Sequence, residues 1–137
     1  MTGKEPVNYR YQKVLLVDDN EIDNFINERI ISSSGFAKEV IVKNSSDTAI
    51  DFLKENSAHT ASLPRIIFLD LNMPVKDGFV FLQDFNNLDD SVKKYCKVIV
   101  LSSSISPDDI NRASTNPFVY KYLNKPLGEK YLQAIVI

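Results

Sequence analysis

Short apolar runs alternate along this chain with longer stretches in which apolar residues recur at helical spacing. Each run is bounded by polar residues, which is typical of strands that are buried on both faces of a parallel sheet. The sequence predicts such strands over residues 13–17, 39–43, 65–70, 97–101 and 118–123.

Helices are predicted between these strands and after the last one. In the first, Ile22, Phe25, Ile26, Arg29 and Ile30 recur at helical spacing, and a Ser-Ser-Ser-Gly sequence follows as a stop signal. The other helices are expected around 49–53 behind a Ser45 or Ser46 cap, around 79–85, over 108–114 behind Ser106-Pro107, and over 128–137. Residues 55–64 are expected to form a loop.

The alternation of strands and helices predicts the fold class. Five strand–helix units in about 125 residues indicate one α/β domain on a parallel sheet. Right-handed crossovers then place helices on both faces of that sheet. The polar residues 1–12 are expected to form a flexible arm, and residues 13–137 to form the folded domain.

Composition excludes several classes of protein. Sixteen basic and eighteen acidic residues give a net charge of −2, so the chain has no broad basic patch for direct contact with nucleic acid. A single cysteine, Cys96, and a single histidine, His59, exclude a disulfide framework and a zinc finger. Cys96 is expected to pack as a small apolar residue, and His59 to lie on the surface. The apolar runs are too short for membrane insertion, and we expect a cytoplasmic protein.

Polar side chains follow most of the predicted strands at the point where each strand ends. Asp18 and Asp19 follow the first strand, Asp70 ends the third, Ser102 follows the fourth, and Lys125 comes soon after the fifth. In open parallel sheets, ligands bind beyond the carboxyl ends of the strands. Each residue alone could mark a solvated loop, but the set in this order predicts a functional site.

Three neighbouring carboxylates indicate the chemistry of that site. Their mutual repulsion would raise their pKa values, and a hard divalent cation would relieve it. Ligation by oxygen alone is typical of Mg²⁺, which also binds phosphate oxygens. A carboxylate can itself accept a phosphoryl group to give an aspartyl phosphate. The residues therefore predict a Mg²⁺ site beside a phosphoryl acceptor.

Four motifs together resemble the receiver domain of two-component response regulators, in its single-domain chemotaxis-type form. They are the tandem acids of VLLVDDN, the DLNMPVKDG segment, the hydroxyl residue after VIVL, and the Lys-Pro of YLNKP. The resemblance runs from about residue 13 to the last residue. It implies a flavodoxin-like, doubly wound parallel sheet in the order 2-1-3-4-5 with about five helices.

The resemblance also implies roles at the acidic end of the site. Asp70 matches the phosphoacceptor. Asp19 matches the direct metal ligand, and Asp18 matches its partner, which often acts through water. Asn72 matches the position whose backbone carbonyl completes the metal site.

Further roles follow at the other positions that match. Ser102 matches the switch hydroxyl, as Ser in place of the commoner Thr, and Lys125 matches the lysine that pairs with the phosphoacceptor and then with the phosphoryl group. Tyr122 matches the aromatic switch, although its place in an alternating strand also suits a partly buried aromatic. Pro74 and Gly78 match residues that shape the turn after the third strand. In the family, the peptide bond that precedes the proline of the Lys-Pro motif is cis.

Partners follow from the same resemblance. The phosphodonor is expected to be a sensor histidine kinase or a phosphotransfer protein, and the output an altered face for an unknown protein partner. That face comprises the helix over 108–114, the strand over 118–123 and the last helix, and the same face permits a homodimer. Its mixed charges come from Asp108, Asp109, Arg112, Lys121, Glu129 and Lys130.

Two other functions fit parts of the same pattern. A degenerate receiver would bind partners without phosphorylation, but here all the acids, Ser102 and Lys125 are present. An aspartate-nucleophile phosphatase of the haloacid dehalogenase type usually carries a second aspartate two residues after the nucleophile, where this chain has Asn72. The sequence leaves open whether the chain is complete or part of a larger regulator or hybrid kinase.

Overall fold

The strands form one parallel sheet, as predicted. The computed structural model describes residues 8–73 and 77–136, and its strand order is β2-β1-β3-β4-β5. This is the doubly wound, flavodoxin-like arrangement. The strands are β1 (Tyr11–Val17), β2 (Ala37–Lys43), β3 (Ile66–Leu69), β4 (Lys97–Ser102) and β5 (Val119–Asn124).

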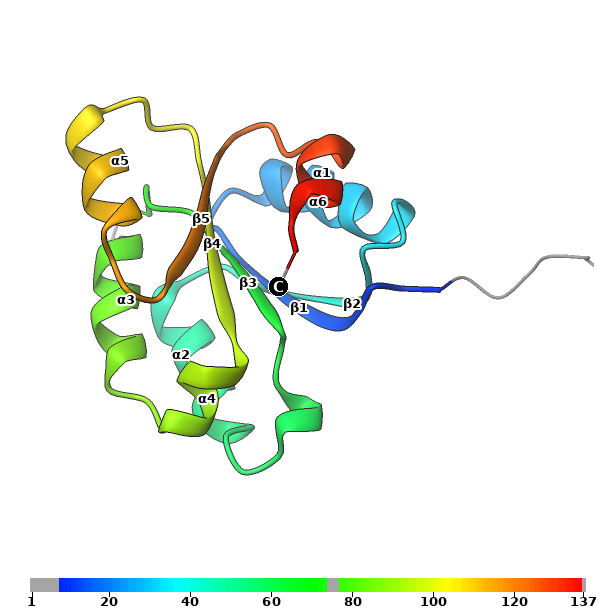
Figure 1. The fold of residues 1–137 in the computed structure, drawn as a ribbon, viewed down its shortest axis with the longest axis vertical. Helices are drawn as coiled ribbons and strands as arrows, with labels where there is room; N and C mark the ends of the chain where they lie inside the picture. The colour runs from blue at the N-terminus through cyan, green and yellow to red at the C-terminus, as the bar shows by residue number, and fades with distance from the viewer. Residues whose placement is uncertain (1–7, 74–76, 137) are drawn as a thin grey trace, which may run out of the picture.

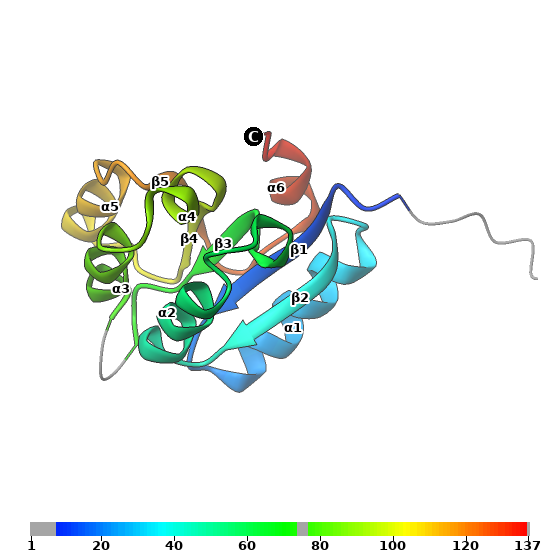
Figure 2. The same ribbon diagram turned by 90° about the horizontal axis from the view of Figure 1, so that it is seen from below.

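Helices cover both faces of the sheet, with α1 and α6 on one side and α2 to α5 on the other (Figures 1 and 2). Their bounds are α1 (Glu21–Ser33), α2 (Ser46–Glu55), α3 (Gly78–Asn86), α4 (Asp90–Tyr95), α5 (Pro107–Ser114) and α6 (Glu129–Ala134). Four helix starts have the side-chain caps that such positions favour: Asn20 accepts from the Asp23 N–H, Ser45 from the Thr48 N–H, Asp77 from the Phe79 and Val80 N–H groups, and Ser106 from the Asp109 N–H.

Several elements and their boundaries differ from the predicted ones. Helix α4 was not predicted, because its only buried residue is Val92 and six residues are too few for a visible period. A short 3₁₀ turn, η1 (Thr60–Ser62), lies in the predicted loop. Strand β1 begins at Tyr11, within the predicted arm, and α6 ends at Ala134 rather than at the last residue.

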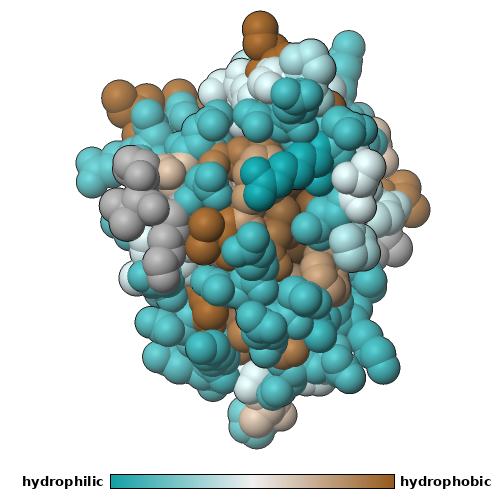
Figure 3. All heavy atoms as spheres, turned by 90° about the vertical axis from the view of Figure 1, so that its left-hand side faces the viewer, coloured by the Kyte–Doolittle hydropathy of each residue, from teal (hydrophilic) through white to brown (hydrophobic). Residues whose placement is uncertain are grey.

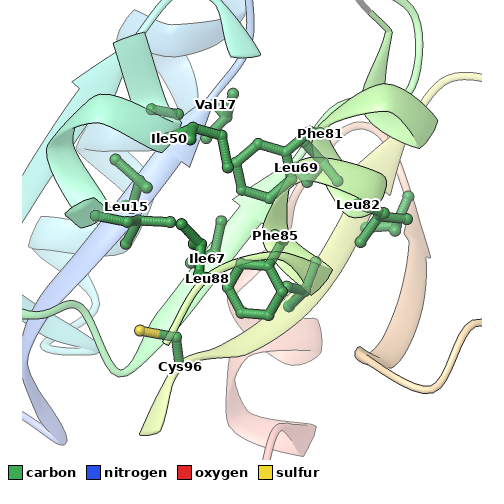
Figure 4. Close-up of a cluster of buried hydrophobic side chains, with 14 of the residues drawn as sticks. Leu15, Val17, Ile50, Ile67, Leu69, Phe81, Leu82, Phe85, Leu88 and Cys96 are labelled. Atoms are coloured by element: carbon green, nitrogen blue, oxygen red, sulfur yellow. The ribbon is translucent and has the colours of Figure 1, made fainter. Parts of the chain in front are cut away.

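Two apolar cores lie on opposite faces of the sheet. The larger joins alternate residues of β1, β3 and β4 to α2 and α3, with Phe81 and Phe85 fully buried (Figure 4). The smaller joins the other face of the strands to α1 and α6 through Ile31 and Leu132. Cys96 is buried in the larger core, and burial raises the pKa of its thiol to about 12. It packs as a small apolar residue, as predicted, and His59 is exposed.

Helix α1 does not bury the residues that its apolar spacing suggests. Ile22, Phe25 and Ile26 are 71%, 63% and 44% exposed, whereas Asn24 and Asn27 are buried. The Asn24 side chain donates a hydrogen bond to the Asp18 backbone carbonyl at 2.8 Å. In this orientation the polar stripe of the helix faces the sheet edge, and the buried amide nitrogen of Asn24 has a partner there.

We expect Phe85→Ala to lower the free energy of unfolding by about 3–5 kcal/mol, the usual loss for a buried aromatic. Phe25→Ala is the matched control, and it should change that free energy by less than about 0.5 kcal/mol, as surface substitutions usually do. Urea denaturation of both variants measures the difference. A large loss for Phe25→Ala would contradict the orientation of α1.

Candidate functional site

The register of the sheet brings the predicted acids together. Val17 of β1 pairs with Leu69 of β3, and each strand then continues into its acidic residue. Carboxylate oxygens of Asp18, Asp19 and Asp70 all lie within 4.8 Å of one another. Asp18 and Asp70 are buried, and Asp19 is exposed. The predicted acidic cluster is therefore present at the carboxyl edge of the sheet.

Lys125 reaches the cluster from the end of β5. Its backbone N–H donates to the Ser102 carbonyl at 2.9 Å, which ties the lysine to the end of β4. Its Nζ lies 2.6 Å from Asp18 Oδ2, 2.8 Å from Asp23 Oδ2 and 3.5 Å from Asp70 Oδ2. Asp23 was not among the predicted site residues. It lies in the first turn of α1, four residues after Asp19.

Asn72 and Ser102 lie beside the acceptor carboxylate. The Asn72 backbone N–H donates to Asp70 Oδ1 at 3.2 Å, and its side-chain amide donates to Ser102 Oγ at 3.4 Å. Ser102 is fully buried, and its Oγ also accepts from the Ser104 N–H at 3.1 Å. The predicted hydroxyl is thus held between the loop after β3 and the loop after β4.

Tyr122 is linked to the same loop after β4. Its hydroxyl donates to the Ser104 carbonyl at 3.0 Å, and the Asn124 amide donates to that carbonyl at 3.3 Å. Ser104 Oγ donates to Asp109 Oδ2 at 2.9 Å. Ser104 therefore joins the ends of β4 and β5 to the first turn of α5.

Gly78 allows α3 to begin directly against the acceptor strand. A Cβ at this position would lie 2.7 Å from the Asp70 carbonyl oxygen and 2.8 Å from Leu71 Cα, distances that side chains do not tolerate. Pro74, the other residue expected in this turn, lies outside the described residues. The Lys125–Pro126 peptide bond is cis, as the resemblance implied.

Burial and charge shift two pKa values in the site. Burial, followed by the charge of Asp18, raises the pKa of Asp70 to about 6, although Lys125 and the Asn72 N–H act in the opposite direction. Burial alone would lower the pKa of Lys125, but its hydrogen bonds to Asp18 and Asp23 outweigh this and raise it. The site therefore stabilises the ammonium and destabilises the Asp70 carboxylate.

A hollow in the surface opens beside the exposed carboxylate. It is lined by Asp19, Asn72, Met73, Asp77, Asp109 and Arg112, among others. The surrounding face, which carries α3 and α5, is mostly hydrophilic with apolar surface near its centre (Figure 3). The acidic cluster can therefore be reached from solvent on the Asp19 side.

The sheet order and the placement of the site define a flavodoxin-like α/β protein with its polar site beyond the strand ends. The sequence model of the response regulator receiver domain matches residues 14–137, and the chain belongs to this family of two-component signalling proteins. None of the helices within 8–73 and 77–136 has the length and apolar character needed to cross a membrane.

Two curated relatives have similar lengths. The probable methanogenesis regulatory protein FilR2 of Methanothrix harundinacea is 32% identical over 123 residues, which cover 90% of this chain and 77% of FilR2. The response regulator Rcp1 of Synechocystis is 32% identical over 124 residues, which cover 90% of this chain and 82% of Rcp1.

Solved structures share the fold. A two-component response regulator from Cytophaga hutchinsonii superposes with a TM-score of 0.82 at 34% identity, over 89% of this chain and 91% of that one. The Mn²⁺-bound form of Rcp1 superposes with a TM-score of 0.72 at 29% identity, over 90% of this chain and 91% of Rcp1. The phosphorylated cyanobacterial phytochrome response regulator RcpA superposes with a TM-score of 0.72 at 32% identity, over 89% of this chain and 86% of RcpA.

The raised pKa of Asp70 predicts a pH dependence of stability without metal. The folded-state pKa of about 6 lies above the unfolded value near 4, so the folded protein binds more protons between these values. The contribution of Asp70 to the free energy of unfolding should fall by about 2–3 kcal/mol as the pH rises from about 4 to 7. Asp70→Asn should remove this fall and exceed the wild type in stability at pH 7.5.

Urea denaturation in a chelating buffer at several pH values measures this difference. Asp51→Asn, which removes an exposed carboxylate on α2, is the matched control and should follow the wild-type pH profile. Parallel profiles for the wild type and Asp70→Asn would contradict the raised pKa.

Proposed function

We propose that this receiver domain is a phosphorylation-controlled signalling switch, in which Asp70 accepts a phosphoryl group. The observation that carries the proposal is the convergence of Asp18, Asp19 and Asp70 within 4.8 Å, with the Lys125 ammonium among them. A sensor histidine kinase or a phosphotransfer protein would supply the group from a phosphohistidine. We also propose that the protein is cytoplasmic and that residues 13–137 form the switch domain.

The donor atoms of the site fit Mg²⁺. Asp18, Asp19 and Asp70 offer only hard oxygen ligands, and the Asn72 backbone carbonyl is proposed to complete the set. When bound, Mg²⁺ would neutralise carboxylate charge and favour the ionised form of Asp70. The Mn²⁺-bound form of the relative Rcp1 supports a divalent cation here.

The chain's own residues would prepare Asp70 for the transfer. The Asn72 N–H holds Asp70 Oδ1 at 3.2 Å, which fixes the orientation of the carboxylate. A carboxylate oxygen then forms a bond to phosphorus, while the bond from phosphorus to the histidine nitrogen breaks and its electron pair stays on the histidine. The ammonium of Lys125 would compensate the negative charge of the new phosphoryl group. The phosphorylated state of the similar protein RcpA supports this chemistry.

Ser102 is proposed to sense the phosphoryl group. Its oxygen already accepts hydrogen bonds from Ser104 and Asn72, so its hydroxyl hydrogen is available to a phosphoryl oxygen. A displacement of Ser102 would act on Ser104, whose carbonyl and hydroxyl bond to Tyr122 and Asp109. The local charge would in this way bias the loop after β4 and the start of α5.

The output is proposed to be a protein-binding face formed by α5, β5 and α6. Ile105 and Tyr120, next to or within these elements, are 83% and 50% exposed, and large exposed apolar side chains favour protein contacts. The downstream partner is a protein of unknown identity, or a second copy of the chain in a homodimer. The degenerate receiver is less well supported, because all the acids, Ser102 and Lys125 occupy the site.

Incubation with acetyl phosphate and Mg²⁺ tests the proposal. Intact-protein mass spectrometry should detect one phosphate adduct in the wild type. The adduct should be absent after chelation of Mg²⁺ and absent in Asp70→Asn, because that substitution removes the acceptor oxygen. Asp51→Asn is the control for the loss of a carboxylate elsewhere and should be phosphorylated like the wild type.

A wild type that binds Mg²⁺ but gains no phosphate would refute the switch and support the degenerate receiver. Turnover of a small phosphate ester without adduct formation would instead favour the phosphatase. Mg²⁺ binding is followed by titration of the metal-free protein.

Tyr122→Phe tests the proposed link between the loop and β5. The substitution removes the hydrogen bond to the Ser104 carbonyl, which is worth about 1 kcal/mol. The Ser104 amide should therefore exchange its hydrogen about fivefold faster in the unphosphorylated protein. Tyr120→Phe is the matched control on the same strand, because that hydroxyl bonds to the Val136 carbonyl instead. Equal exchange in both variants would exclude Tyr122 as the link.

A further inference from the structure

The ammonium of Lys125 is shared between the acidic cluster and a residue of α1. Asp23 Oδ2 lies 2.8 Å from Nζ, closer than Asp70 Oδ2 at 3.5 Å. Asp23 is partly exposed, with 36% of its side chain accessible, whereas the Lys125 side chain is 13% accessible. The lysine that faces the acceptor is thus already paired with a carboxylate outside the predicted site.

We infer that Asp23 is a positioning residue that competes with the phosphoryl group for the Lys125 ammonium and so weakens the phosphorylated state. The inference rests on the proposed function and concerns the regulation of the same site. A phosphoryl group carries nearly two negative charges and three acceptor oxygens. Each carboxylate already bonded to Lys125 offsets part of the positive charge that this group needs.

Two opposing effects of Asp23 can be compared in size. As a tether, Asp23 is largely redundant, because Asp18 holds the same ammonium at 2.6 Å from a buried position. As a charge, it repels any anion on Asp70. One unit charge roughly 6 Å away, at a dielectric constant between about 40 and 80, changes an affinity about threefold to tenfold. The charge effect therefore exceeds the tether effect.

Beryllofluoride, a noncovalent mimic of a phosphoryl group, measures the competition at equilibrium. At saturating Mg²⁺, Asp23→Asn should bind beryllofluoride about threefold to tenfold more tightly than the wild type. The same substitution should weaken Mg²⁺ binding about twofold to fivefold in the absence of beryllofluoride, because it removes negative charge near the cation. Opposite changes in the two affinities distinguish a charge effect from general loosening of the site, which would weaken both.

Two further variants sharpen the test. Asp23→Ala removes the hydrogen-bond acceptor as well as the charge, and it should also bind beryllofluoride more tightly. Glu28→Gln removes one exposed charge elsewhere on α1, and both of its affinities should stay within about twofold of the wild type. Unfolding midpoints close to that of the wild type show that each variant is folded.

The possible results separate the inference from the proposed function. If the wild type binds beryllofluoride and both Asp23 variants bind it equally or more weakly, the inference is overturned and the proposed function stands. A wild type that binds Mg²⁺ but no beryllofluoride would overturn the proposed function, and the inference would fall with it. An equal gain in Glu28→Gln would also overturn the inference, because the effect would then reflect net charge and not the contact with Lys125.

Discussion

Asp18 and Asp70 are buried side by side beneath one ammonium, and the carboxyl edge of the sheet is organised around this contact. A buried charge is costly unless it is paired and hydrogen-bonded. Lys125 meets this need only because the pairing of β4 with β5 and its own backbone bond to Ser102 bring it back over β1 and β3. Four strands of the sheet therefore contribute to one electrostatic cluster.

The negative charges of that cluster exceed the positive charge of Lys125. Asp18, Asp23 and Asp70 lie within 4 Å of the Lys125 ammonium, and Asp19 lies beside Asp18 and Asp70. Burial, followed by the charge of Asp18, raises the pKa of Asp70. A divalent cation beside these oxygens would relieve the repulsion, and it would also make Asp70 a better acceptor by keeping it ionised. The raised pKa of Asp70 and the proposed function thus have the same electrostatic origin.

The site residues that the sequence predicts are those placed by the pairing of strands in the sheet. Buried strands appear as continuous apolar runs, and a parallel sheet brings their carboxyl ends to one edge, so Asp18, Asp70 and Ser102 could be located without coordinates. The rotation of α1 could not be predicted, because its apolar spacing favours burial of Ile22 and its neighbours, whereas the structure buries Asn24, which bonds to the Asp18 carbonyl. Asp23 was missed for the same reason, since its contact with Lys125 depends on that rotation.

The loop after β4 differs physically from the edge that it borders. The strands beside it are held by backbone hydrogen bonds within the sheet and by two apolar cores, whereas Ser104 is held by polar bonds to Ser102, Tyr122, Asn124, Asp109 and Ser106. Polar bonds of this kind contribute little net free energy each, and water can replace them when a segment opens. A change of charge at Asp70 would therefore displace this loop and α5 while the strands of the sheet keep their register. The loop moves first because less free energy opposes its displacement than opposes a shift of the strands.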